Sequence, residues 1–209
     1  MLNSEGFDLW ANNYDNDVNI SQENNNYPFA GYKEVLNGIY KLIRQKDKAK
    51  VLDIGFGTGI LTTQLYRSGC MITGIDFSSK MIDIAKLKMP EARLINCDFS
   101  KGLPSKITNQ AFDYIISTYA MHHLEDGAKI SLIKSFGDLL APNGLILIGD
   151  VSFETEEELE KCKERYSNVW DNDEYYFVVN GIRQKLGDAY YCNYKKVSHC
   201  AGILTIAKE

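Results

Sequence analysis

The stretch KVLDIGFGTGIL at residues 50–61 is the strongest indicator of architecture in this chain. It consists of an apolar run that ends near Asp53, three alternating glycines, and the first residues of a helical pattern. Glycine tolerates positive φ and has no Cβ, so such a turn lets the backbone come close to a ligand. The helix N-terminus that follows adds free N–H groups and the positive end of a dipole. The stretch therefore predicts a strand, a ligand-binding turn and a helix.

The spacing of the three glycines narrows the choice of ligand. Gly55, Gly57 and Gly59 form G-x-G-x-G, and Ile60 stands where a dinucleotide fingerprint would have its third glycine. An acidic residue, Asp53, precedes them. This arrangement resembles the first motif of class I S-adenosylmethionine (SAM) dependent methyltransferases more than it resembles an NAD-binding loop.

Length and composition limit the classes of protein to which this chain can belong. The 209 residues suit a single domain, and 44% hydrophobic with 24% charged residues allows an ordinary globular core. The net charge of −5 argues against nucleic acid as the main partner, because phosphate binding needs a basic face. No apolar stretch approaches the ~20 residues of a membrane span, so no membrane association is expected.

The cysteines indicate the compartment and argue against a metal centre. Five cysteines without a C-x-x-C pair fit a reduced, cytoplasmic protein better than a disulfide framework. The adjacent pair His199-Cys200 lacks further ligands at zinc-site spacing. We therefore expect a cytoplasmic location and no metal site.

Strand and helix signals alternate through the middle of the chain. Strands are predicted over 50–54, 71–75, 92–96, 112–117 and 145–148, and helices over 32–45, 59–67, 79–88 and 127–140. Short β-branched strands between helices indicate a mostly parallel sheet that is covered on both faces.

The pattern changes after residue 153. A charged helix over 154–170 and a second helix ending near Lys185 precede two strands within 189–207, with a turn near 197–202. The predicted fold is α/β: a doubly wound, mostly parallel seven-stranded sheet with a C-terminal antiparallel hairpin, unlike the all-parallel dinucleotide fold. Within one domain, 1–209, we expect an N-terminal helical lid over 1–30, a SAM-binding core over 31–153, and acceptor-side elements over 154–209.

Polar or aromatic residues follow successive predicted strands, at the edge where a doubly wound sheet binds its ligand. Asp76 lies about 20 residues beyond the glycines, where a carboxylate can accept both ribose hydroxyls. Asp98 could accept from the adenine amino group, with Phe99 against the ring. The alternative is that each aspartate only caps a turn or helix. The stretch from Ser117 to Leu124 follows the fourth strand, beside the methyl donor.

Two segments strengthen the resemblance. FDLWANNYD at 7–15 and STYAMHHL at 117–124 are similar to segments of small bacterial SAM-dependent methyltransferases of the ubiquinone/menaquinone methylase group, in a branch of short uncharacterised enzymes. The likeness fades after Phe153. It implies that Gly55, Asp76 and Asp98 contact SAM and that Tyr14 closes over its methionine end. Asp76 stands where the family often has Glu. The predicted cofactor-binding residues are Tyr14, Asp53, Gly55, Gly57, Gly59, Asp76, Phe77, Met81, Asp98, Phe99 and Ser117.

Methyl transfer from SAM requires few catalytic groups from the protein. Methyl transfer from a sulfonium is an in-line displacement, so alignment of nucleophile and methyl supplies most of the catalysis. A base is needed only for a protonated, weakly acidic acceptor, and His122 is our candidate. Alternatively, His122 and His123 only cap the next helix or pack under the strand. Tyr14, Tyr32 and Tyr119 are candidates for the acceptor pocket.

The residues after the fourth strand also bear on the acceptor. They lack the proline-containing motif of enzymes that methylate exocyclic amines of bases, and no cysteine follows a proline, as it would in base-carbon methylases. We therefore expect a small-molecule acceptor. The other functions left open are a non-catalytic SAM-binding regulatory module and an NAD(P)-dependent oxidoreductase.

Overall fold

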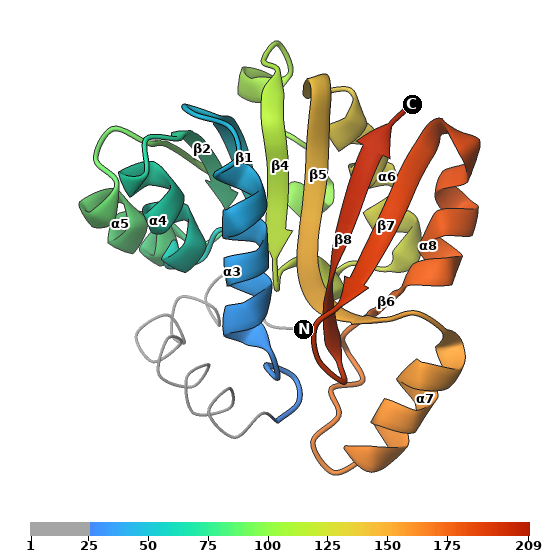
Figure 1. Cartoon of the computed structure of the whole chain (residues 1–209). Coiled ribbons are helices and arrows are strands. Elements are labelled where there is room, and N and C mark those ends of the chain that lie inside the picture. The colour runs from blue at the N-terminus through green and yellow to red at the C-terminus, as the bar shows by residue number, and fades with distance from the viewer. Residues whose placement is uncertain (1–25) are drawn as a thin grey trace.

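The computed structural model describes residues 26–209, in which one sheet lies between layers of helices (Figure 1). Across this part of the chain the strands follow the order β3-β2-β1-β4-β5-β8-β7, and the short β6 pairs with β5 off this path. The strands are β1 Lys50–Ile54, β2 Met71–Asp76, β3 Arg93–Asn96, β4 Phe112–Thr118, β5 Leu140–Phe153, β6 Phe177–Val178, β7 Tyr190–Lys196 and β8 Ala201–Lys208.

The direction of the strands confirms the predicted fold class. β1 pairs in parallel with both β2 and β4, and β4 pairs in parallel with β5. β8 is antiparallel to both of its neighbours, β5 and β7, so the C-terminal hairpin inserts one reversed strand into the sheet. This reversed strand distinguishes the sheet from the all-parallel dinucleotide fold.

Helices cover both faces of the sheet. α3 and α4 lie over one face, and α6 and α8 lie over the other (Figure 1). The helices are α3 Tyr32–Ile43, α4 Ile60–Arg67, α5 Ser79–Lys88, α6 Asp126–Gly137, α7 Glu156–Arg165 and α8 Val179–Leu186. In α3, Val35, Ile39 and Ile43 recur at four-residue intervals and are fully buried, as an amphipathic helix on a sheet requires.

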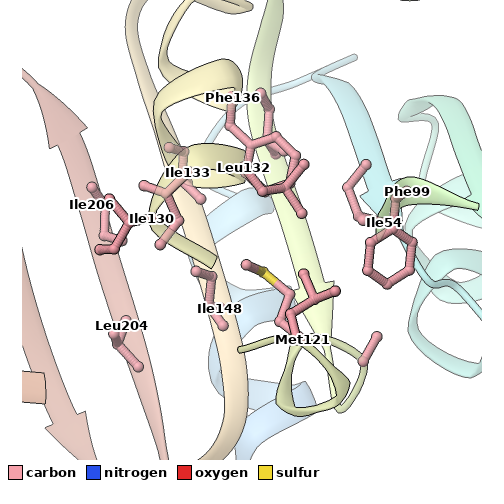
Figure 2. Packing of buried hydrophobic residues seen from close by; sticks show 14 of the residues in the cluster. Ile54, Phe99, Met121, Ile130, Leu132, Ile133, Phe136, Ile148, Leu204 and Ile206 are labelled. Atoms are coloured by element: carbon pink, nitrogen blue, oxygen red, sulfur yellow. The ribbon is translucent and has the colours of Figure 1, made fainter. Parts of the chain in front are cut away.

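The core under α6 shows how the central strands are held (Figure 2). Ile133 and Phe136 of α6 lie over the sheet with Ile148 of β5 and Ile206 of β8, and all four side chains are fully buried. Strands covered on both faces must be apolar on both faces, which explains the nearly continuous apolar runs in β4 and β5. This packing fixes the positions of the central strands, and the candidate site lies at their carboxyl ends.

The structure differs from the sequence prediction in the extent of two elements. β5 begins at Leu140, five residues before the predicted 145–148 strand. The Phe112 N–H donates to the Leu139 carbonyl at 2.9 Å, so pairing with β4 begins as soon as α6 ends, and an irregularity in the ladder absorbs the turn residues. α7 ends at Arg165 rather than near 170, and Trp170 instead stacks on Tyr27 with ring centroids 5.0 Å apart.

Several predictions for the N-terminal segment lie outside the described residues. These are the aromatic helix, Tyr14, and all but residues 26–30 of the expected lid. Among helices within 26–209, none combines the length and the apolar character that crossing a membrane requires.

Candidate functional site

The site is a cleft at the carboxyl ends of the parallel strands, the edge where open α/β sheets bind ligands. Its empty space amounts to about 680 Å³, a volume that includes space open to solvent. The glycine turn after β1, the end of β2, the first turn of α5 and the segment after β4 form its walls. Six predicted cofactor residues line it: Gly55, Gly57, Asp76, Phe77, Met81 and Phe99.

The three glycines of the turn have different surroundings. All have positive φ, +71° at Gly55, +56° at Gly57 and +77° at Gly59. A Cβ on Gly55 would lie 2.5 Å from the Cβ of Ala120, so this glycine allows the turn to pack against the end of β4. Gly59 begins α4 and faces Met89 rather than the cleft. A Cβ on Gly57 would meet no atom of residues 26–209 within 4 Å, so this part of the chain leaves room for a ligand beside it.

Asp76 ties the glycine turn to the end of β2. Its carboxylate is buried and accepts backbone hydrogen bonds from Gly57 at 2.8 Å and from Ser78 at 2.9 Å. The bond from Ser78 is the turn-capping role considered as the alternative, while the bond from Gly57 organises the cleft. A carboxylate oxygen can accept more than one hydrogen bond at a time, which is the property that a ribose-binding residue requires.

Asp53 lies beneath the turn and does not line the cleft. One carboxylate oxygen accepts from the Thr62 hydroxyl at 2.5 Å, and the other is buried without a hydrogen-bond partner among the described residues. Burial raises the pKa of Asp53 to about 7, which the Thr62 hydrogen bond opposes and the nearby Asp76 charge reinforces. A buried acceptor without a partner is costly, so a hydrogen-bond donor or a positive charge nearby would be favourable.

Two further predicted residues have structural partners. Asp98 caps a short 3-10 helix, accepting from the Ser100 N–H at 3.0 Å, and it pairs with Lys101 at 3.0 Å. The buried Ser117 hydroxyl donates to the Ile54 carbonyl at 2.9 Å and joins β4 to β1. Neither lines the cleft as described, so their contacts with a cofactor remain predictions.

The two adjacent histidines after β4 have different surroundings. His123 lines the cleft together with Tyr32 and Tyr119, two of the predicted acceptor-pocket tyrosines. His122 is buried with its Nδ1 2.6 Å from an Asp150 carboxylate oxygen and its Nε2 3.4 Å from Glu174. The predicted general base therefore faces two carboxylates rather than the cleft wall.

The charges around the histidines shift their pKa values in opposite directions. Burial disfavours the imidazolium of His122, but Asp150 and Glu174 outweigh it and raise the pKa of His122. Burial, assisted by the charge of His122, lowers the pKa of His123 to about 3. His123 is therefore neutral at physiological pH.

Sequence reasoning missed Asp150 and Glu174. Asp150 had a usable signal, because it comes just after a predicted buried strand, as Asp76 does. Glu174 had none. It lies in an irregular segment, which the Tyr175 N–H joins to the residues after β4 by donating to the His122 carbonyl at 2.7 Å.

Comparisons with known proteins agree on one enzyme class. A family model described as a methyltransferase domain matches residues 51–144. An uncharacterized methyltransferase of Oceanobacillus iheyensis is 30% identical over 97% of this chain and 95% of its own length. At this identity and coverage, the two proteins are members of one family.

Solved structures match the fold. The DhpI complex with S-adenosylhomocysteine (SAH) has a TM-score of 0.67 and 16% identity, over 98% of this chain and 94% of that one. Magnesium protoporphyrin IX methyltransferase from Synechocystis with bound SAH has a TM-score of 0.67 and 18% identity, over 86% of this chain and 84% of that one.

Proposed function

Because the chain belongs to a family of methyltransferases, we propose that it transfers the methyl group of SAM to a small-molecule acceptor and releases SAH. The observation that carries the proposal is the cradle formed by Gly57 and Asp76. The first leaves space beside a backbone that can approach a ligand, and the second places a buried carboxylate at the end of β2. Both stand where the sequence motif predicts a nucleoside site.

In this proposal Asp76 accepts the ribose hydroxyls, and Phe77, Met81 and Phe99 surround the adenine. All four line the cleft. The buried Asp53 oxygen that lacks a hydrogen-bond partner among the described residues lies beneath the turn, where a cationic ligand would stabilise the ionised carboxylate. SAH is present in the DhpI and Synechocystis structures that share the fold, which supports a SAM-type ligand here. The roles of Tyr14, Gly59, Asp98 and Ser117 in cofactor binding stay predictions.

SAM, when bound, supplies an activated methyl group, so the protein's task is to align the acceptor and exclude water. Tyr32 and Tyr119 offer apolar rings on the cleft wall for this purpose. Their ring centroids are 4.9 Å apart, close enough to form one surface. The acidic net charge and the residues after β4 favour a small molecule over nucleic acid as acceptor. The role of His122 as general base stays a prediction, as does the cytoplasmic location.

Thermal unfolding with SAM, SAH, NAD and NADP added separately tests the ligand. A ligand present at ~100 times its Kd should stabilise the fold by about 2.7 kcal/mol. We expect SAM and SAH to raise the midpoint, and NAD and NADP to leave it unchanged. A rise with NAD or NADP alone would replace the methyltransferase proposal with hydride transfer.

A second measurement distinguishes an enzyme from a SAM-binding regulatory module. The protein is incubated with SAM carrying a labelled methyl group and a panel of small hydroxyl, thiol, amine and acid acceptors. Transfer of label to one of these acceptors supports the enzyme. Tight SAM binding without transfer to any acceptor, in the panel or in a cell extract, supports the module.

A further inference from the structure

Three side chains beside the cleft converge in a way that the proposed methyl-donor site does not use. His122, His123 and Glu174 each offer one ligand atom, and these atoms all lie within 4.8 Å of one another. The two histidines lie in the short 3-10 helix Met121–His123 after β4, and Glu174 comes from the segment before β6. We propose that these three side chains bind a divalent transition-metal cation, with zinc as the representative ion.

The distances suit a metal better than a direct hydrogen bond. Glu174 Oε1 lies 3.4 Å from His122 Nε2 and 4.0 Å from His123 Nδ1. Charge-assisted N–H···O bonds are shorter, at about 2.7–2.9 Å. Two ligands of a tetrahedral metal with bonds of ~2.1 Å lie about 3.4 Å apart. The other two separations among the ligand atoms are at most 4.8 Å and would shorten toward this value when a metal binds.

The surrounding hydrogen bonds are those that metal ligands need. Asp150 approaches His122 Nδ1 at 2.6 Å, which fixes the ring and leaves Nε2 toward Glu174. The Tyr176 hydroxyl donates to the other oxygen of Glu174, also at 2.6 Å. Metal-binding histidines almost always bond a carboxylate or carbonyl through their second nitrogen, and ligating carboxylates are hydrogen-bonded in turn.

The cluster also has suitable charge and composition. Two imidazoles and a carboxylate match the ligand set of catalytic zinc sites, which keep a further coordination position open. Asp150 and Glu174 provide two negative charges beside the histidines, which favours a divalent cation.

The position of the cluster suggests how the metal would serve the reaction, and this part of the inference rests on the proposed function. His123 lines the same cleft as Gly57 and Asp76, so a metal bound to it would sit at the cleft rim. An open coordination position there would take an oxygen of the acceptor, such as a hydroxyl or an acid group. The metal would orient that oxygen and lower its pKa.

The test is metal binding by chelator-treated protein, without SAM or acceptor. Zn²⁺ is titrated by calorimetry, and Co²⁺ by its visible absorption, which reports coordination geometry. We expect one ion per chain. Glu174→Gln and His123→Asn should each weaken binding by at least about 10-fold, while Asp150→Asn should weaken it ~10–100-fold through loss of the bond that orients His122.

His199→Asn provides the matched control, because His199 is the third histidine of the chain and lies outside the cluster. It should bind Zn²⁺ and Co²⁺ as the wild type does. Circular dichroism and thermal unfolding establish that each variant is folded. Glu174→Gln is the safest probe, since glutamine keeps the size and shape of the glutamate side chain.

Two results would overturn the metal site. One is failure of the wild type to bind Zn²⁺ or Co²⁺, and the other is undiminished binding by folded Glu174→Gln and His123→Asn. If SAM still stabilises the protein in either case, only the metal inference fails and His122 remains available as a base. If the metal binds but SAM does not, the metal site stands and the methyl-donor proposal fails.

Discussion

Replacing Asp76 with alanine gives the most informative perturbation of the cleft. The substitution removes the acceptor of two backbone hydrogen bonds, from Gly57 at 2.8 Å and from Ser78 at 2.9 Å. Each buried donor left without a partner costs about 1–3 kcal/mol. Water in the cleft can reach part of the space, so we expect a loss of ~2–4 kcal/mol in the free energy of unfolding.

The same substitution should weaken SAM binding. Loss of hydrogen bonds to a charged acceptor costs at least about 1–3 kcal/mol, which corresponds to roughly a 5- to 150-fold rise in Kd. Disorder of the glycine turn would add to this value. Isothermal titration calorimetry measures the affinity, and urea unfolding measures the stability of the same samples.

Asp113→Ala is the control that distinguishes a loss of stability from a loss of SAM affinity. Asp113 also accepts a backbone hydrogen bond, from Lys50 at 2.8 Å, and pairs with Lys46, but it lies at the opposite end of the sheet from the cleft. We expect lowered stability and unchanged SAM affinity for this variant. If folded Asp76→Ala bound SAM as tightly as the wild type, Asp76 would have no place in the donor site and the cradle argument would fail.

Three further predictions concern the site and its support. The pKa of Asp53 is about 7 against 3.8 unperturbed, so between pH 4 and 7 the folded protein keeps a proton that the unfolded chain has lost. Stability should fall as pH rises through this window, by up to ~4 kcal/mol, and urea unfolding of Asp53→Asn should lack that fall. Gly55→Ala places a Cβ 2.5 Å from Ala120 Cβ at a φ of +71°, so its melting temperature should drop sharply, and an unchanged value would contradict the packing. Phe136→Ala empties a fully buried position and should cost about 3–5 kcal/mol in urea unfolding, whereas a loss under 1 kcal/mol would mean that the core under α6 is not tightly packed.

The order of strands and helices could be predicted because the signals are local. Alternating glycines after an apolar run, and helical spacing such as that of Val35, Ile39 and Ile43, reflect backbone geometry within a few residues. Strand ends then predict the cleft, since carboxyl ends of parallel strands meet at one edge. Gly55, Gly57 and Asp76 were found this way, and all three line the cleft.

Local pattern could not predict the hydrogen-bond partners of two motif residues. Asp98 and Ser117 match positions in the motif, yet their observed partners are Ser100, Lys101 and the Ile54 carbonyl. Which of these bonds forms depends on how β4 lies against β1 and how the chain turns after β3. A motif fixes the residue type at a strand end but not the direction of its hydrogen bonds.

The residue pattern alone thus specified the family resemblance, the alternating elements, the reversed hairpin and several residues that line the cleft, because each follows from spacing along the chain. Only the tertiary structure showed that the adjacent His122 and His123 have different surroundings. It also showed that Asp150 and Glu174 lie beside them. These groups lie on β5 and on segments after β4 and before β6, and the distances between them depend on packing. Side chains on separate elements are brought within 2.6–4.0 Å by the folded core, which no local periodicity encodes.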